Sequence, residues 1–412
     1  MSKRMCISTL TLSLLVFLMI TVTPLQAAAP ADLSKAPRTI KIGVCFSITG
    51  KFAGFYSVMG DWEDALEKVV NERGGIYVGE YGTRLPIQVK WYDDKSDPAT
   101  SIKFYERLVT VDKVDFLIGP TASPPAMAAS TVADKYKIPM ILTSSTDPQI
   151  YSRGLKWITC SVETGLPWTK YYFEMLKEKT NAKTVALVTE DTIWPLGIRQ
   201  GALETIKEMG FDLVYDKLAP ADTKDFSSVI LALKRLNPDV IYVPAFGPFF
   251  TTFVKQVHEQ KLKPNALHGT AGVSTGFCQA MGTSGANYIT GDSYWVPGLK
   301  NEGFDVLEEI EKKAKINIME WCYGPAPNYA SHQILFKAIE AAGTLDREKV
   351  QKVLETTHFE TIGGNWHRQP NGVGTYNPYP VQNIDGQLYT IWPSGTATKT
   401  FVYPIPYSGK DD

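Results

Sequence analysis

The chain has 412 residues, more than one ordinary hydrophobic core accommodates, so we expect two domains or lobes. Its composition is 44% hydrophobic and 21% charged, and its formal net charge is −1, as is common for a globular protein in water. No block of basic residues occurs, so we expect no binding to nucleic acid or to an anionic membrane surface.

Residues 1–28 have the pattern of a secretory signal peptide. A basic start precedes an apolar run from Met5 to Ile20, and the small residues of PLQAAAP follow it. The run is shorter than the roughly 20 apolar residues that a membrane-spanning helix needs. We therefore expect export, with cleavage after Ala27 or Ala28.

From residue 39 onward, short apolar runs alternate with amphipathic helical stretches. In the first unit we expect strands at 39–48, 85–94, 114–120 and 137–145, and helices at 62–74, 97–108 and 123–136. Near-continuous apolar strands that alternate with helices predict a parallel sheet with both faces covered.

A second unit of similar size begins near residue 168. We expect strands at 183–191, 211–219, 238–245 and 265–270, and helices at 168–178, 197–209, 226–236 and 249–260. Residues 288–354 add a strand and several helices. The tail from Gly363 is rich in Gly, Pro and aromatic residues, and Asp385-Gly386 predicts the turn of a terminal hairpin. The fold class is α/β with two lobes.

Four cysteines remain after the signal peptide: Cys45, Cys160, Cys278 and Cys322. Export would allow them to pair, and their spacing leaves every pairing open. Cys45 lies in an apolar strand, where a buried free thiol is the expected state.

The sequence contains few signs of catalysis. No pair of histidines has the i, i+4 spacing of a helical metal site, and no glycine-rich phosphate-binding loop follows a strand. The stretch GVSTG, residues 272–276, matches the G-x-S-x-G pattern of hydrolases, with Asp346 and His358 downstream in the right order. The strand before it is short and polar, which favours a simple turn. We expect no enzyme, no metal and no cofactor.

Polar and aromatic residues gather where the predicted strands end. The strand ends of the first unit carry hydroxyls and backbone amides before helices, as in IGPTASPP and ILTSSTDP, which suits a carboxylate. Those of the second unit carry Trp194 and Phe246. Ligands of open α/β sheets bind at the carboxyl ends of strands, so we expect a small-molecule site between the two units.

At these residues the sequence resembles a known family, the type I periplasmic binding proteins of the leucine/isoleucine/valine group. The matching stretches are IKIGVCFSITGKFAGFY, VVNERGGI, VKWYDDKSDPATS, FLIGPTASPP, KIPMILTSST and DFSSVILALKRLNPDVIYV. The resemblance implies two Rossmann-like lobes joined by three crossing segments, with residues 38–158 plus 287–368 in the N-terminal lobe and residues 159–286 plus 369–405 in the C-terminal lobe. It also implies a monomer in the periplasm that delivers its ligand to an ABC permease in the membrane.

The resemblance also implies ligand-binding residues. The family's carboxylate cradle falls on Ser123, Ser144 and Thr146, and strand alternation would put the last two on one side. Its aromatic residues fall on Phe55, Trp194 and Phe246. We expect Tyr56, which follows Phe55, to bind the ligand with them.

The sequence departs from the family at two places. The acid that holds an amino acid's ammonium group would fall on Ala271, which cannot balance a buried positive charge. The positions of the family's first-lobe disulfide are Ser96 and Ala122, so that bridge is missing.

The missing acid divides the ligand hypotheses. A hydroxyl cradle that faces no acid predicts a small carboxylate without an amine, either aromatic or otherwise apolar. An amino-acid ligand is the alternative if Asp147, Glu163 or Asp191 replaces the missing acid. A sensor or chemoreceptor partner of the same fold is a second alternative, because it would bind the same ligand without delivering it.

Overall fold

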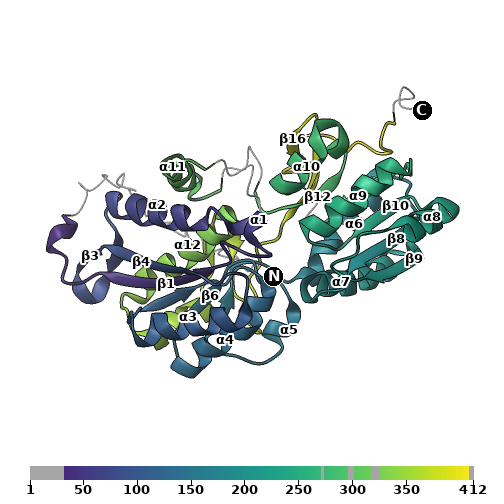
Figure 1. Cartoon of the computed structure of the whole chain (residues 1–412). Coiled ribbons are helices and arrows are strands. Elements are labelled where there is room, and N and C mark those ends of the chain that lie inside the picture. Colours follow the sequence, from purple (N-terminus) through teal and green to yellow (C-terminus); the bar gives the residue numbers. More distant parts are fainter. Residues whose placement is uncertain (1–31, 271–272, 296–300, 317–323, 408–412) are drawn as a thin grey trace, which may run out of the picture.

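The computed structural model describes residues 32–270, 273–295, 301–316 and 324–407, and these form two lobes (Figure 1). The predicted signal peptide, Ala271 and Cys322 lie outside the described residues. In the part that is described, no helix has the length and apolar character to cross a membrane.

The first lobe is built on a five-stranded parallel sheet in the order β4-β1-β5-β6-β7. Its strands are β1 (Ile40–Phe46), β4 (Ile87–Asp93), β5 (Phe116–Ile118), β6 (Met140–Leu142) and β7 (Ile158–Cys160). Its helices are α1 (Ala53–Tyr56), α2 (Met59–Glu72), α3 (Pro98–Thr110), α4 (Ser123–Tyr136), α5 (Pro148–Tyr151), α11 (Phe304–Ala314), α12 (Pro325–Ala342) and α13 (Arg347–Thr356). Two small hairpins complete it, β2 (Ile76–Val78) with β3 (Thr83–Leu85) and β13 (Phe359–Thr361) with β14 (Gly364–Trp366), together with the 3₁₀ turns Leu33–Lys35 and Gly79–Tyr81.

The second lobe is built on a seven-stranded sheet in the order β16-β15-β12-β11-β10-β8-β9. Its strands are β8 (Thr184–Glu190), β9 (Asp212–Ala219), β10 (Val240–Val243), β11 (Ala266–Gly269), β12 (Thr290–Ser293), β15 (Tyr379–Ile384) and β16 (Gln387–Thr390). Its helices are α6 (Gly165–Lys179), α7 (Ile193–Met209), α8 (Ser227–Leu236), α9 (Gly247–Glu259) and α10 (Thr275–Ala286). Strands β8 to β12 are parallel to one another, whereas β15 is antiparallel to both of its neighbours, β12 and β16.

Local sequence signals account for several element boundaries. The Asp97 side chain accepts a hydrogen bond from the backbone N–H of Thr100, and Pro98 occupies the first turn, so α3 begins where predicted. Asp385 and Gly386 have φ angles of 54° and 81°, and they form the tight turn between β15 and β16.

The chain passes between the lobes three times: after β7, after β12 and after β14. Strand β12 pairs with β11 and β15 in the second sheet, which moves residues 290–293 out of the N-terminal lobe predicted from residue 287. The sequence TGDS is too short and polar to predict a sheet, so its neighbours decide where it belongs. Conversely, residues 159–160 were predicted to begin the C-terminal lobe, but they belong to the first sheet as part of β7.

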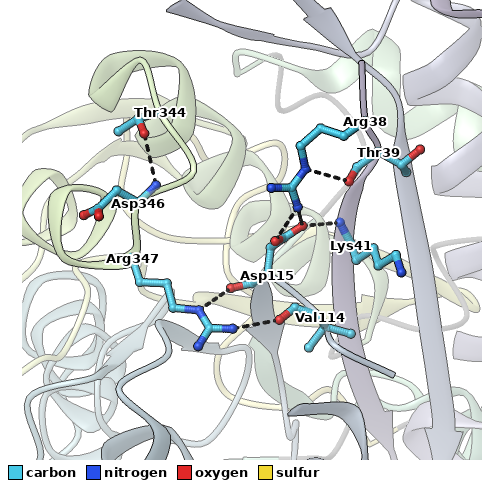
Figure 2. Close-up of polar contacts among 8 residues, drawn as sticks. All are labelled: Arg38, Thr39, Lys41, Val114, Asp115, Thr344, Asp346 and Arg347. Atoms are coloured by element: carbon cyan, nitrogen blue, oxygen red, sulfur yellow. Dashed lines mark hydrogen bonds and ion pairs between the residues drawn. The ribbon is translucent and has the colours of Figure 1, made fainter. Parts of the chain in front are cut away.

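At the amino ends of its central strands, the first sheet is held by an acid between two arginines (Figure 2). The Asp115 carboxylate accepts hydrogen bonds from Arg38 Nη2 at 2.6 and 2.7 Å and from the Lys41 backbone N–H at 2.9 Å. Arg347, in the first turn of α13, donates to the carbonyl oxygens of Val114 and Asp115 at 2.9 and 3.2 Å. These bonds join the starts of β1, β5 and α13, so the first lobe is braced at the end away from the cleft.

Candidate functional site

A cavity lies between the two lobes, at the carboxyl ends of the parallel strands. Its wall contains residues from both lobes: Phe55, Tyr56, Thr121, Ala122, Ser123, Ser144, Trp168, Trp194 and Phe246. This is the position at which open α/β sheets bind ligands, because the loops that leave the strands converge there.

The first lobe supplies the polar wall. Thr121, Ala122 and Ser123 follow β5 and lead into the N-terminus of α4, and Ser144 follows β6. Thr121 is 1% exposed, and its hydroxyl has no hydrogen-bond partner among the described residues. A buried hydroxyl at a helix N-terminus suits an anionic group, since the positive end of the helix dipole and the hydroxyl act together.

Proline shapes the same helix start. Ser123 is followed by Pro124 and Pro125, which have no backbone N–H, so Ser123 has the only N–H of the first three helical residues. No side chain caps this end of α4. Anion binding here would therefore rest on Ser123 and on the hydroxyls around it rather than on a full turn of amides.

Aromatic rings form the rest of the wall. The ring centroids of Trp194 and Phe246 are 4.7 Å apart, and Trp168 meets Trp194 edge-on at 5.9 Å. From the first lobe, Phe55 lies 6.2 Å from Phe246 and 5.9 Å from Tyr56. Of these contacts, the one between Phe55 and Phe246 crosses between the lobes, so the aromatic wall is complete only while the lobes are together.

Helix starts hold two of the second-lobe rings, Trp194 and Phe246, in place. Trp194 is the second residue of α7, and Phe246 is the N-cap of α9. The backbone N–H of Phe246 donates to Glu190 Oε2 at 2.9 Å, and Glu190 is the last residue of β8. Glu190 thus fixes the loop that carries Phe246.

Six of the predicted site residues come together around this cavity: Ser123, Ser144, Phe55, Tyr56, Trp194 and Phe246. Thr146 does not line it and is fully buried, with its carbonyl oxygen accepting from the Gly165 N–H at 2.8 Å. Strand β6 ends at Leu142, so the alternation expected for Ser144 and Thr146 does not reach them. Ala271 lies outside the described residues, and the ligand contacts of all these residues stay predictions.

Three further residues line the wall that the sequence did not predict: Thr121, Ala122 and Trp168. The first two stand in the stretch IGPTASPP beside Ser123, so that strand-end signal extends to them. Trp168 lies in α6, and no local pattern separates it from a core tryptophan.

None of the three alternative acids lines the cavity. Glu163 accepts from Gln369 Nε2 at 2.5 Å and from the Thr164 N–H at 2.9 Å, and burial raises its pKa. Asp191 is exposed. Asp147 is 1% exposed, its Oδ2 has no hydrogen-bond partner among the described residues, and burial raises its pKa.

The G-x-S-x-G match forms a helix cap. Ser274 is the N-cap of α10, and its hydroxyl oxygen accepts from the Phe277 N–H at 3.4 Å. Asp346 caps α13 in the first lobe, and the His358 ring stacks on His367 at 4.7 Å. Ser274, Asp346 and His358 therefore each have other partners, and the expectation that GVSTG forms a turn at the start of a helix is the one the structure matches.

Metal and disulfide chemistry find no support in the described part of the chain. Its His, Cys, Asp and Glu residues form no group of three that could hold a metal ion. Cys45, Cys160 and Cys278 are free thiols, and burial raises the pKa of each.

Comparisons with known proteins agree with this architecture. A family model described as "Periplasmic binding protein" matches residues 39–387. A leucine-, isoleucine-, valine-, threonine- and alanine-binding protein of Pseudomonas aeruginosa is 26% identical over 376 residues, which cover 90% of this chain and 94% of that protein. Leu/Ile/Val-binding protein homolog 7 of Brucella abortus is 24% identical over 410 residues, which cover 92% of this chain and 97% of that protein.

Solved structures share the fold. A solute-binding protein of an ABC transporter from R. palustris, in complex with 4-hydroxybenzoate, has a TM-score of 0.74 and 21% identity, and covers 89% of this chain and 98% of its own. The branched-chain amino acid binding protein LivJ of Streptococcus pneumoniae, in complex with isoleucine, has a TM-score of 0.72 and 22% identity. The match covers 85% of this chain and 98% of the LivJ chain. At these identities the likeness concerns the fold alone.

Proposed function

The chain belongs to the periplasmic binding protein family, and on that premise we propose that it captures a small carboxylate without an amine and delivers it to an ABC permease. The ligand is aromatic or otherwise apolar. The protein acts in the periplasm after removal of its signal peptide, and it binds its ligand without chemical change.

The observation that carries this proposal is the division of the cavity wall. Hydroxyls and a helix N-terminus of the first lobe share the wall with aromatic rings of both lobes, and no carboxylate belongs to the wall as described. A bound ammonium group would be buried among rings without an acid to balance it, which costs several kcal/mol. In a carboxylate with an apolar body, the carboxylate can bind the hydroxyls and the apolar body can pack against the rings.

The charge of Glu190, the second-lobe acid bonded to the backbone of Phe246, is already balanced. Glu190 Oε1 lies 3.7 Å from Lys51 Nζ, and its Oε2 accepts the Phe246 N–H. Both oxygens of this carboxylate therefore have partners from the protein itself, which leaves little attraction for a ligand's amine.

An amino-acid ligand is the second candidate, favoured by the names of the curated relatives. The decisive test is a matched pair of ligands, leucine and 4-methylpentanoate, which differ only by the α-ammonium group. Isothermal titration with this pair, and with benzoate against benzamide, separates the roles of amine and carboxylate. We expect binding of 4-methylpentanoate or benzoate and none of leucine or benzamide.

Binding of leucine with no binding of 4-methylpentanoate would overturn the proposal in favour of the second candidate. If benzamide binds as tightly as benzoate, the proposal that the site recognises a carboxylate is wrong.

A further inference from the structure

One ion pair joins the two lobes beside the aromatic wall. Lys51 lies in the loop between β1 and α1 of the first lobe, and Glu190 ends β8 in the second. Lys51 Nζ is 3.7 Å from Glu190 Oε1, and Figure 1 shows α1 at the side of the first lobe that faces the second. The contact can exist only when the lobes are together.

The two partners differ in burial. The Glu190 side chain is 2% exposed, and Oε1 also accepts from the Thr192 hydroxyl at 3.0 Å while Oε2 accepts from the Phe246 N–H. The Lys51 side chain is 50% exposed. The carboxylate is therefore fixed before closure, and only the lysine becomes ordered when the pair forms.

The same ammonium group lies over two aromatic rings. Lys51 Nζ is 5.7 Å from the centroid of Phe52 and 5.3 Å from that of Phe246, distances at which a cation is attracted to a ring face. Phe52 and Phe246 are themselves 5.3 Å apart across the lobes. Lys51 thus contacts both the acid that positions Phe246 and the Phe246 ring.

We propose that Lys51 is a positioning residue for ligand capture, a latch that holds the closed state through Glu190 and Phe246 and so sets how long the ligand is retained. The proposal rests on the proposed function only for the chemistry of the ligand, because a latch between lobes would retain any small molecule in this cavity. Contacts made only in the closed state shift the population toward it.

The alternative role for Lys51 is attraction of an anionic ligand toward the cleft. Lys51 also lines a hollow beside the cavity, with Phe55, Gly247 and Ser274 among its other lining residues. Attraction of this kind changes the association rate, whereas a latch changes the dissociation rate. Rate measurements therefore separate the two roles.

The experiment compares wild type with Lys51→Met, Lys51→Arg, Glu190→Gln and the double variant Lys51→Met/Glu190→Gln. Methionine retains an apolar stem of similar length, and glutamine retains an oxygen for the Phe246 N–H. Lys103→Met, on α3 of the first lobe, is the matched control for loss of one lysine charge. Stopped-flow tryptophan fluorescence reports binding, since Trp168 and Trp194 line the cavity.

With benzoate as the probe, we expect Lys51→Met to raise the dissociation rate roughly 3- to 10-fold and to leave the association rate within about twofold of wild type. The dissociation rate of Lys51→Arg should stay close to that of wild type. Lys51→Met should raise the dissociation rate by a smaller factor in the Glu190→Gln background than in wild type. If the two residues acted independently, that factor would be the same in both backgrounds.

A lower association rate with an unchanged dissociation rate would overturn the latch, as would equal effects of Lys51→Met and Lys103→Met. The same rates are measured with leucine. If leucine binds and benzoate does not, the proposed ligand class fails while the comparison of variants still decides the latch.

Discussion

The backbone N–H of Asp147 donates a hydrogen bond to Ser123 Oγ at 3.3 Å, which links the loop after β6 to the start of α4. Because the Ser123 oxygen accepts this bond, its own hydrogen remains to donate elsewhere. Ser123 lines the cavity, so that hydrogen can serve a ligand carboxylate.

We therefore expect Ser123→Ala to weaken carboxylate binding roughly 10- to 100-fold, the effect of one hydrogen bond to a charged group. Titration calorimetry with benzoate or 4-methylpentanoate measures it. Ser152→Ala, at an exposed serine of the same lobe, is the control and should leave the dissociation constant unchanged. Equal affinities of the two variants would remove Ser123 from the site.

Asp147 predicts a pH dependence of ligand binding. Its side chain is buried beside α7 of the second lobe, with Oδ2 3.8 Å from where a Cβ on Gly197 would lie, and burial raises its pKa above 3.8. Opening of the lobes exposes the carboxyl and returns its pKa toward the ordinary value. The closed state therefore gains stability as pH falls through the raised pKa and loses it as pH rises.

The measurement is ligand affinity from about pH 4 to pH 8, with wild type compared to Asp147→Asn. Wild-type affinity should rise as pH falls through the raised pKa of Asp147, and the asparagine variant should bind with little dependence on pH. A wild-type profile that is flat, or that falls toward acid, would contradict this prediction.

Gly197 on α7 predicts a steric limit on closure. A Cβ at this position would lie 3.2 Å from Pro148 Cδ, at the start of α5 in the first lobe. Gly197→Val should therefore hold the lobes apart and weaken ligand binding by roughly tenfold or more, because closure would force an overpacked contact. The melting temperature of the ligand-free protein should change little, since the contact lies between lobes. Gly395→Val, where a Cβ meets open space, is the control.

A buried contact between an acid and a histidine in the first lobe predicts a large effect on stability. Glu63 Oε2 lies 3.2 Å from His332 Nε2, both side chains are fully buried, and Glu63 Oε1 accepts from Asn328 Nδ2 at 2.7 Å. Removal of the acid leaves two buried polar partners unsatisfied. Glu63→Ala should lower the free energy of unfolding by about 3–5 kcal/mol, measured by urea unfolding. The exposed Lys313–Glu72 pair nearby offers the control Glu72→Ala, which should cost less than about 1 kcal/mol.

Local patterns alone predicted the alternation of strands and helices, the start of α3 at Asp97-Pro98 and the hairpin turn at Asp385-Gly386. These features depend on neighbours in sequence: apolar periodicity, a helix cap and a turn that favours positive φ. The place of Thr290–Ser293 in the second sheet could not be predicted in this way, because its partners β11 and β15 come from distant parts of the chain.

The residues of the cavity wall could likewise be predicted only in part from the sequence. The sequence by itself determined which residue types stand at the strand ends, namely Ser123 and Ser144 in one lobe and Trp194 and Phe246 in the other. Only the tertiary structure decided that Trp168 joins this wall, that Thr146 lies buried away from it, and that Lys51 reaches Glu190. Side-chain type is fixed residue by residue along the chain, whereas contact across a cleft depends on how two separately folded lobes come together.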